Sequence, residues 1–220
     1  MTRYDKRIWA LAVGCSALAG YVDAIGFLSL GGFFVSFMSG NSTRLGVGLA
    51  QGSPAVAVAA GLIGTFLLGV IAGSFTGHVA GRNRRPAVLA LVAALLTIAA
   101  ALASAGTQHA AIVVAGLAMG AENAIFERDG EVHIGLTYMT GTLVKLGQRI
   151  TAALLGGSRV AWMPYLLLWL GLVAGGLAGA LIYPPLGLGA LWIAAGVAAM
   201  LAIVAAKIGH HREGYMSAKT

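Results

Sequence analysis

Two stretches of the chain, 36–46 and 137–147, carry hydroxyl, glycine and cationic residues in the same order. Each contains a corner, Met38–Asn41 or Met139–Thr142, where glycine allows a sharp change of backbone direction and a following side chain can cap a helix. Two half-helices that begin there would present free N–H groups and the positive ends of their dipoles to a solute. We therefore predict that these corners line a solute pathway. The predicted pathway residues are Ser39, Gly40, Asn41, Thr43, Arg44, Thr140, Gly141, Thr142 and Lys145.

The same spacing has a second interpretation, in which both segments are ordinary helices with one small face. Ser36, Ser39, Gly40 and Thr43 recur at helical spacing, and the second stretch repeats the pattern. Small faces of this kind mediate close contact between helices in membranes. The pathway and the packing interpretations therefore both stay open.

Three polar residues follow long apolar runs: Asp23, and about 100 residues later Glu122 and Asn123. A carboxylate inside an apolar segment is costly, so its first interpretation is functional. Asp23 aligns with Asn123, so the position is polar in both copies and acidic in one. We expect Asp23 to be either a proton-coupling carboxylate or a static group near the membrane interface, in an ion pair or as a helix cap. The candidate partners for an ion pair are Arg44, Lys145 and Arg149.

The elements that position these residues follow from the composition. The chain of 220 residues is 59% hydrophobic and 10% charged, whereas a soluble domain is about a quarter charged. Charge-free runs cover 45–81, 86–121 and 160–206, each long enough for at least one span of about 20 residues. We predict an all-α polytopic membrane protein that is a single integral membrane domain over 1–220. The single Cys15 excludes an internal disulfide framework.

Hydropathy and breaker residues predict eight segments, of which 35–51 and 135–154 are short, rich in Ser, Thr and Gly, and interrupted by cations. If these two segments are broken or re-entrant, every basic flank falls on the cytoplasmic side, and so do both termini. Each half, 8–105 and 109–207, then crosses the membrane three times, which predicts a 3+3 inverted repeat. The predicted segments are 8–27, 35–51, 54–80, 87–105, 109–126, 135–154, 160–183 and 187–207.

The repeat extends to both sides of the corners, with offsets of 100, 101 and 102 residues. It aligns Gly69, Ala72, Gly73 and Gly77 with a second ladder of small residues, and such ladders are typical of helix-packing faces. The second ladder consists of Gly171, Ala174, Gly175 and Gly179.

The run from Ala19 to Leu28, followed by Gly31 to Gly46 with its Met-Ser-Gly-Asn-Ser-Thr-Arg-Leu-Gly sequence, resembles the YoaK-type family of small bacterial membrane proteins. The resemblance covers essentially the whole chain in length and segment pattern. It implies a multi-pass protein of the bacterial cytoplasmic membrane and implies no substrate.

Two functions are expected from these patterns. The first is a small transporter or channel for a small polar or anionic solute, with its pathway at the repeat interface between the two corners. The alternative is a non-transporting membrane scaffold or assembly protein packed through its glycine-rich faces. The chain carries no membrane-enzyme motif, so we expect no enzyme, no cofactor and no metal site. The expected partners are the lipid bilayer and a solute; a homodimer is allowed, and nucleic acid is not expected.

Overall fold

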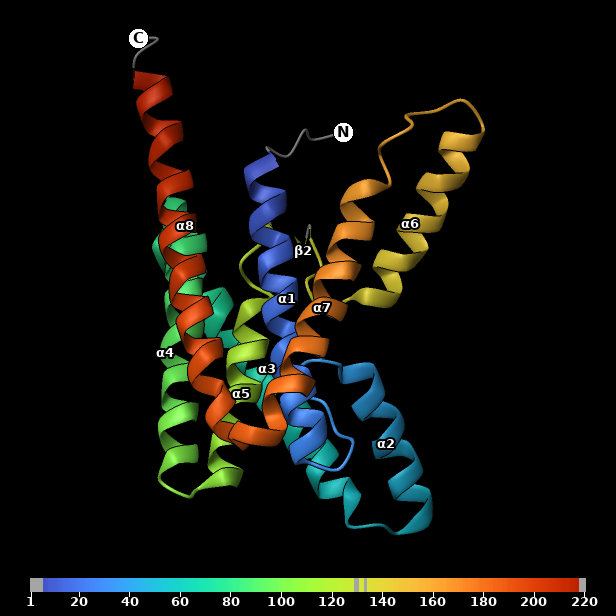
Figure 1. Cartoon of the computed structure of the whole chain (residues 1–220), viewed down its shortest axis with the longest axis vertical. Helices are drawn as coiled ribbons and strands as arrows, with labels where there is room; N and C mark the ends of the chain where they lie inside the picture. The colour runs from blue at the N-terminus through green and yellow to red at the C-terminus, as the bar shows by residue number, and fades with distance from the viewer. Residues whose placement is uncertain (1–5, 129–130, 133, 218–220) are drawn as a thin grey trace.

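The protein is a bundle of helices in the computed structural model, which describes residues 6–128, 131–132 and 134–217 (Figure 1). Two strands of two residues each pair antiparallel in a small hairpin after α5. In chain order the elements are α1 (Lys6–Ser29), α2 (Met38–Gln51), α3 (Ala55–Ala80), the 3-10 turn η1 (Gly81–Asn83), α4 (Arg84–Ser104), α5 (Gln108–Glu122), β1 (Glu127–Arg128), β2 (Glu131–Val132), α6 (Met139–Leu154), α7 (Met163–Leu186), η2 (Gly187–Ala190) and α8 (Leu191–Ser217).

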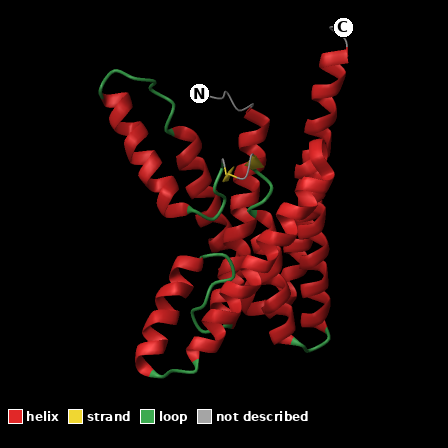
Figure 2. Ribbon diagram, turned by 180° about the vertical axis from the view of Figure 1, so that it is seen from behind, coloured by secondary structure: helices red, strands yellow, loops and turns green. Residues whose placement is uncertain are grey.

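The central bundle consists of α1, α3, α4, α5, α7 and α8, while α2 and α6 diverge from it (Figures 1 and 2). Both begin near the middle of the molecule, and they run toward opposite ends (Figure 1). With 14 and 16 residues, α2 and α6 are shorter than the 20 or so residues that a membrane-spanning helix needs. We call them the half-helices. Both chain termini lie at the same end of the bundle, together with the α3–α4 and α6–α7 connections (Figure 1).

Three helical stretches in the described part of the chain are long and apolar enough to cross a membrane: Lys6–Ser29, Ala55–Ser104 and Met163–Ile208. The second and third are helical hairpins, because each contains a 3-10 turn that starts with a left-handed glycine, Gly81 (φ 53°) or Gly187 (φ 54°). The second of these turns follows Pro184 and Pro185, which fall in the gap between the predicted segments 160–183 and 187–207. The structure instead includes both prolines in the last turn of α7.

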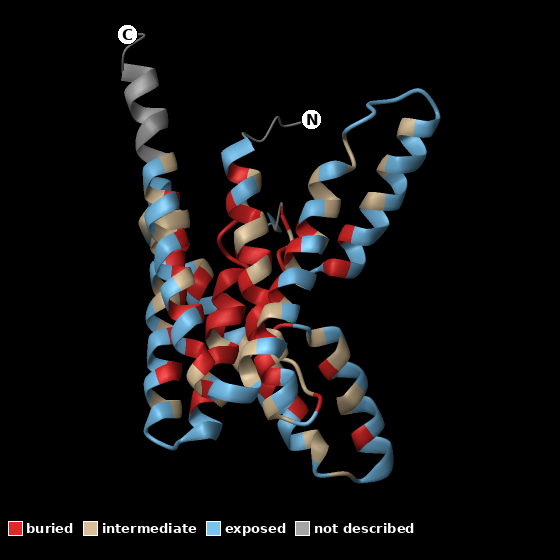
Figure 3. Ribbon diagram, viewed as in Figure 1, coloured by how far each residue is buried: buried red, intermediate tan, exposed pale blue. Residues whose placement is uncertain are grey.

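Buried residues concentrate where α1 crosses α5 and α7, whereas the outer faces of the bundle and both half-helices are largely exposed (Figure 3). Many exposed residues are large and apolar, such as Leu68, Phe75 and Leu181. Exposed apolar side chains on every outer helix are what a surface in contact with lipid chains requires, because such a surface gains nothing from polar groups.

Glycine brings the backbones of facing helices into contact in two equivalent pairs, α1 with α7 and α3 with α5. Four glycines, one on each of these helices, lie where an added Cβ would overlap a carbonyl oxygen of the opposite helix. They are Gly20 opposite Leu172, Gly175 opposite Ala17, Gly120 opposite Phe66, and Gly69 opposite Leu117. The predicted ladders of small residues are therefore helix-packing faces.

These contacts correct the alignment of the two ladders. Gly69 faces Leu117 and Gly175 faces Ala17, and those two partners are 100 residues apart, as the repeat requires. By these contacts Gly69 corresponds to Gly175, whereas the sequence pattern pairs it with Gly171, about one helical turn earlier. Glycine recurs every four residues along both ladders, so the sequence pattern alone could not distinguish these registers.

Adding one methyl group tests this backbone contact. We expect Gly175→Ala to lower the melting temperature of the purified protein, because the new Cβ overlaps the Ala17 carbonyl and overpacking costs about 1–3 kcal/mol. Gly196→Ala on α8 is the matched control, since its Cβ would meet nothing within 4 Å and alanine favours helix. Equal melting temperatures for the two variants in detergent would contradict the contact.

Candidate functional site at the start of the half-helices

Asp23 on α1 holds the non-helical segment that leads into α2. Its Oδ1 accepts hydrogen bonds from the backbone N–H groups of Val35 (2.8 Å) and Ser36 (2.7 Å), and its Oδ2 accepts one from the Ser36 hydroxyl (2.6 Å). Val35 and Ser36 are both buried. Buried backbone groups outside a helix need partners, above all at membrane depth. The carboxylate therefore supplies the hydrogen-bond acceptors that carbonyl oxygens would supply if this segment were helical.

Asn41 holds the same segment from the other side. Its Oδ1 accepts the N–H of Phe34 (3.1 Å), and its Nδ2 donates to the carbonyl oxygen of Phe34 (2.6 Å). Three consecutive backbone N–H groups, at positions 34 to 36, are thus satisfied by side chains. The prediction that Asn41 caps the half-helix is wrong, because α2 begins at Met38 and its N-cap, Phe37, makes no side-chain cap bond. Asn41 lies inside the first turn of α2, and its side chain bonds to Phe34 in the segment before the helix.

An equivalent arrangement precedes the second half-helix. The Thr137 hydroxyl donates to Oδ1 of Asn123 (3.0 Å), as the Ser36 hydroxyl does to Asp23. Nδ2 of Asn123 donates to the carbonyl oxygen of Met119 (3.0 Å). Both Asn123 and Thr137 are buried. The two aligned polar positions therefore share one contact, the bond from the following hydroxyl, with a carboxylate in one and an amide in the other. Only Asp23 also accepts backbone N–H groups among the hydrogen bonds of the described residues.

Ser16 on α1 connects the second non-helical segment to the bundle. Its Oγ lies 3.2 Å from the carbonyl oxygen of Leu136 and 3.0 Å from that of Leu168 on α7. Its hydroxyl can donate to either oxygen. Ser16 is fully buried, so the contact joins three parts of the chain inside the bundle. A single serine in an apolar run carries no distinctive pattern, so Ser16 could not be identified from the sequence.

The corner glycines do not make the change of direction that the sequence predicted. Gly40 and Gly141 lie within α2 and α6, and neither has a positive φ. In the first half the left-handed residues come earlier, at Gly31 (φ 62°) and Gly32 (φ 105°). An added Cβ at Gly40 would lie 2.6 Å from the Phe37 ring, whereas one at Gly141 would meet nothing within 4 Å. The two corners are therefore not equally crowded.

The cations near the corners do not pair with Asp23. Arg44 is half-buried and lies over the ring of Phe33, with its Cζ 5.0 Å from the ring centroid. Lys145 is exposed and Arg149 is half-buried. In the described part of the chain, Asp23 forms no ion pair with any of the three. The predicted ion pair is replaced by hydrogen bonds to the backbone, which satisfy the carboxylate without a counter-charge.

The remaining predicted pathway residues divide by exposure. Asn41 and Thr142 are buried, at equivalent places in the two half-helices, whereas Ser39, Thr43, Thr140 and Gly141 are exposed. The Thr43 hydroxyl donates back to the Ser39 carbonyl oxygen within α2. Each half-helix thus has one buried polar residue, Asn41 or Thr142, and its other predicted pathway hydroxyls lie on the outer surface.

Glu122, the last residue of α5, is fully buried. Neither Oε1 nor Oε2 has a hydrogen-bond partner among the described residues. It interacts electrostatically with Asp23 and Cys15 of α1. The sequence identified Glu122 as a candidate, but its lack of a partner could be seen only in the structure.

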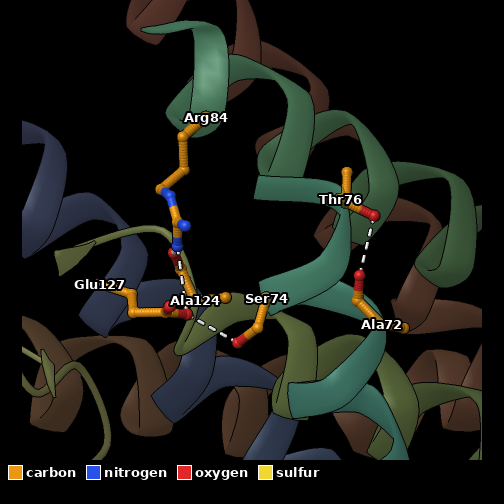
Figure 4. Close-up of polar contacts among 6 residues, drawn as sticks. All are labelled: Ala72, Ser74, Thr76, Arg84, Ala124 and Glu127. Atoms are coloured by element: carbon orange, nitrogen blue, oxygen red, sulfur yellow. Dashed lines mark hydrogen bonds and ion pairs between the residues drawn. The ribbon is translucent and has the colours of Figure 1, made fainter. Parts of the chain in front are cut away.

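A second polar cluster lies where α3, α4 and the segment after α5 meet (Figure 4). Arg84 Nη1 is 3.1 Å from Glu127 Oε2, and the Ser74 hydroxyl donates to the same oxygen (2.6 Å). Arg84 Nη1 also donates to the carbonyl oxygen of Ala124 (3.4 Å). In the sequence Arg84 belongs to one of the basic flanks that are expected to orient the chain. The structure shows that it also binds three elements together.

Interior polar groups, glycine-mediated helix contacts and an apolar outer surface define this chain as a polytopic helical membrane protein. The family model described as "Protein of unknown function (DUF1275)" matches residues 11–204, so the chain belongs to that family. It is 39% identical over 199 residues to the UPF0700 transmembrane protein RA0705 of Rhizobium meliloti (strain 1021), covering 90% of this chain and 86% of the relative. It is 32% identical over 163 residues to the UPF0700 transmembrane protein YoaK of Bacillus subtilis (strain 168), covering 70% and 72%.

No solved structure matches the chain. The relatives confirm the resemblance to the YoaK-type family that the first-half motif indicated. Both are named as transmembrane proteins, which agrees with the apolar helices of this chain.

The role of Asp23 as a backbone anchor leads to a test with two variants. We expect Asp23→Ala to lower stability strongly, because two buried N–H groups lose their partner at about 1–3 kcal/mol each. Asp23→Asn should lower it far less, since an amide oxygen still accepts and Asn123 already occupies the equivalent position. Melting temperatures in detergent measure both. Equal losses for the two variants would show that the charge, rather than the acceptor geometry, matters.

The ion pair of the second cluster can be measured by a double-mutant cycle. Arg84→Met and Glu127→Gln should each destabilise the protein, and the double variant should lose less than the sum of the two. We expect a coupling of about 0.5–3 kcal/mol, because the two side chains are in contact and only 21% and 18% exposed. Additive losses would indicate that the pair contributes nothing beyond its separate contacts.

Proposed function

We propose that this protein is a small membrane transporter or channel, rather than an enzyme, with its solute pathway beside the starts of α2 and α6. The observation that carries the proposal is that both half-helices begin inside the molecule, each after a buried non-helical segment held by side chains. Transporters build their solute sites from such discontinuous helices near the middle of the bilayer. Irregular backbone at that depth is otherwise costly and needs a reason.

We propose further that residues 8–105 and 109–207 form a 3+3 inverted repeat. The equivalent glycine contacts of α1 with α7 and of α3 with α5 support it, as do the opposite directions of the two half-helices (Figure 1). The paired use of Asp23 with Ser36 and of Asn123 with Thr137 supports it as well. In an inverted repeat the interface of the two halves is where alternating access takes place.

The interior favours a neutral or cationic polar solute over an anion. The anion preference expected from the sequence depended on the cations Arg44, Lys145 and Arg149 and on the positive ends of the half-helix dipoles. Of the cations, Arg44 stacks on Phe33 and Lys145 is exposed. The acidic residues of this region are Glu122, which is fully buried, and Asp23, which is half-buried. The carboxylate of Asp23 repels an anion and attracts a cation.

The orientation that we propose places both termini in the cytoplasm of a bacterial cell. The termini share one end of the bundle with the α3–α4 and α6–α7 connections (Figure 1). These connections and the first turn of α4 together carry four arginines. Positive residues accumulate on the cytoplasmic side of membrane proteins. The four are Arg82, Arg84, Arg85 and Arg159.

A scaffold or assembly role is the second candidate, because the backbone contacts at glycine would make a rigid unit with or without a pathway. It predicts no flux of any solute. Measuring solute flux through the reconstituted protein therefore distinguishes a transporter from a scaffold.

Labelling of single cysteines tests the orientation. In a Cys15→Ala background, Asn83→Cys should resist a membrane-impermeant thiol reagent in intact cells, and Thr107→Cys should react with it. The two positions lie at opposite ends of α4, so each is the control for the other. Labelling of position 83 from outside would overturn the proposed orientation.

Uptake into proteoliposomes tests the transport function. A panel of neutral and cationic metabolites should include one that enters vesicles containing the protein faster than empty vesicles. Asn41→Leu should abolish that uptake, because Asn41 is buried at the start of α2, whereas Thr151→Leu, on the exposed part of α6, should leave it unchanged. Folded protein that moves no member of the panel would favour the scaffold.

A further inference from the structure

The carboxyl group of Glu122 occupies an unusual position for an ionisable side chain. It lies at the end of α5 with no exposed surface, and neither oxygen has a hydrogen-bond partner in the described structure. The residues before it on the same face of α5, Ala115, Ala118 and Met119, are apolar and buried. A buried polar atom without a partner is rare in native proteins and calls for an explanation.

No cation of the described residues forms a hydrogen bond with Glu122, and the charged group that interacts with it is acidic. From α1, the groups that interact with it are Asp23, which is acidic, and the thiol of Cys15. From α4, Arg84 is engaged by Glu127 and the Ala124 carbonyl oxygen. Arg85 lies over the Phe126 ring, with its Cζ 5.7 Å from the centroid. On α3, the titratable side chain is His78, which is exposed.

An ionised carboxylate could not persist in these surroundings without a large penalty. An unpaired charge moved out of water costs several kcal/mol even after the protein relaxes, and Asp23 would add repulsion. A protonated carboxylic acid carries no net charge and avoids most of that penalty. A metal cation would instead need several oxygen ligands around it, and the described part of the chain contains no group of residues that could hold a metal ion.

We infer that Glu122 is a proton-binding carboxylic acid at the centre of the bundle and that the proton is the coupling ion of the proposed transport. Binding adds one proton to one carboxylate oxygen, and release returns it, so the step needs no other reactant. The fold does not require an acid at this place, because the aligned position of the first half is occupied by Val22, which is also buried. The coupling part of this inference depends on the proposed function, whereas the protonation does not.

Infrared spectroscopy of the purified protein measures the protonation directly. The wild type at neutral pH should show the carbonyl stretching band of a protonated carboxylic acid, shifted in heavy water. Glu122→Gln should remove the band, and Glu127→Gln, which alters the ion-paired carboxylate of the second cluster, should keep it. Glu122→Val, the residue of the other half, provides a second variant if the glutamine variant does not fold.

Identical spectra for the wild type and both Glu122 variants would overturn the inference. It would also be overturned if adding sodium or potassium abolished the band, since the carboxylate would then bind a metal cation. If a transported solute is found, Glu122→Gln should abolish the dependence of its uptake on a pH gradient. A band that depends on Glu122 in a protein that transports nothing would uphold the proton site and reject only the transport function.

Discussion

One requirement governs the whole structure: every backbone N–H and C=O group inside a membrane needs a hydrogen-bond partner. A chain that stops being helical at that depth must find those partners in side chains. Asp23 and Asn41 provide them for positions 34 to 36, and this allows α2 to begin in the interior instead of at the surface. Without these two side chains the segment would be driven to the interface or into a continuous helix. The half-helix, and any pathway beside it, follows from this anchor.

Glycine provides the second requirement, which is close approach of the central helices. Because α1 meets α7 and α3 meets α5 at the level of the backbone, each pair joins a helix of one half to a helix of the other. The two anchored segments are thereby held against one compact centre. The same closeness keeps water away from Glu122, so packing sets the electrostatic surroundings of the interior.

The sequence predicted the membrane class, the number of helices and the two short segments, because hydropathy and breaker residues report these features locally. Several helix ends lie three or more residues from the predicted limits, as at the end of α7. The sequence also aligned Asp23 with Asn123 and Ser36 with Thr137, the pairs that the structure uses. The sequence did not predict features that depend on which groups meet in the folded chain. Asn41 was interpreted as a cap although it bonds backwards to Phe34, and the glycine ladders were matched one turn out of register because their spacing is itself periodic.

The exchange of helices between the two halves has a consequence for how the protein is made. Ser16 on α1 contacts Leu168 on α7, which is 152 residues further along the chain. During synthesis α1 therefore enters the bilayer long before its partner exists, with its glycine face open to lipid. The first half has no complete fold of its own, so a chain stopped after residue 105 should be a target for membrane proteases. Assembly must wait for the ribosome to finish the second half.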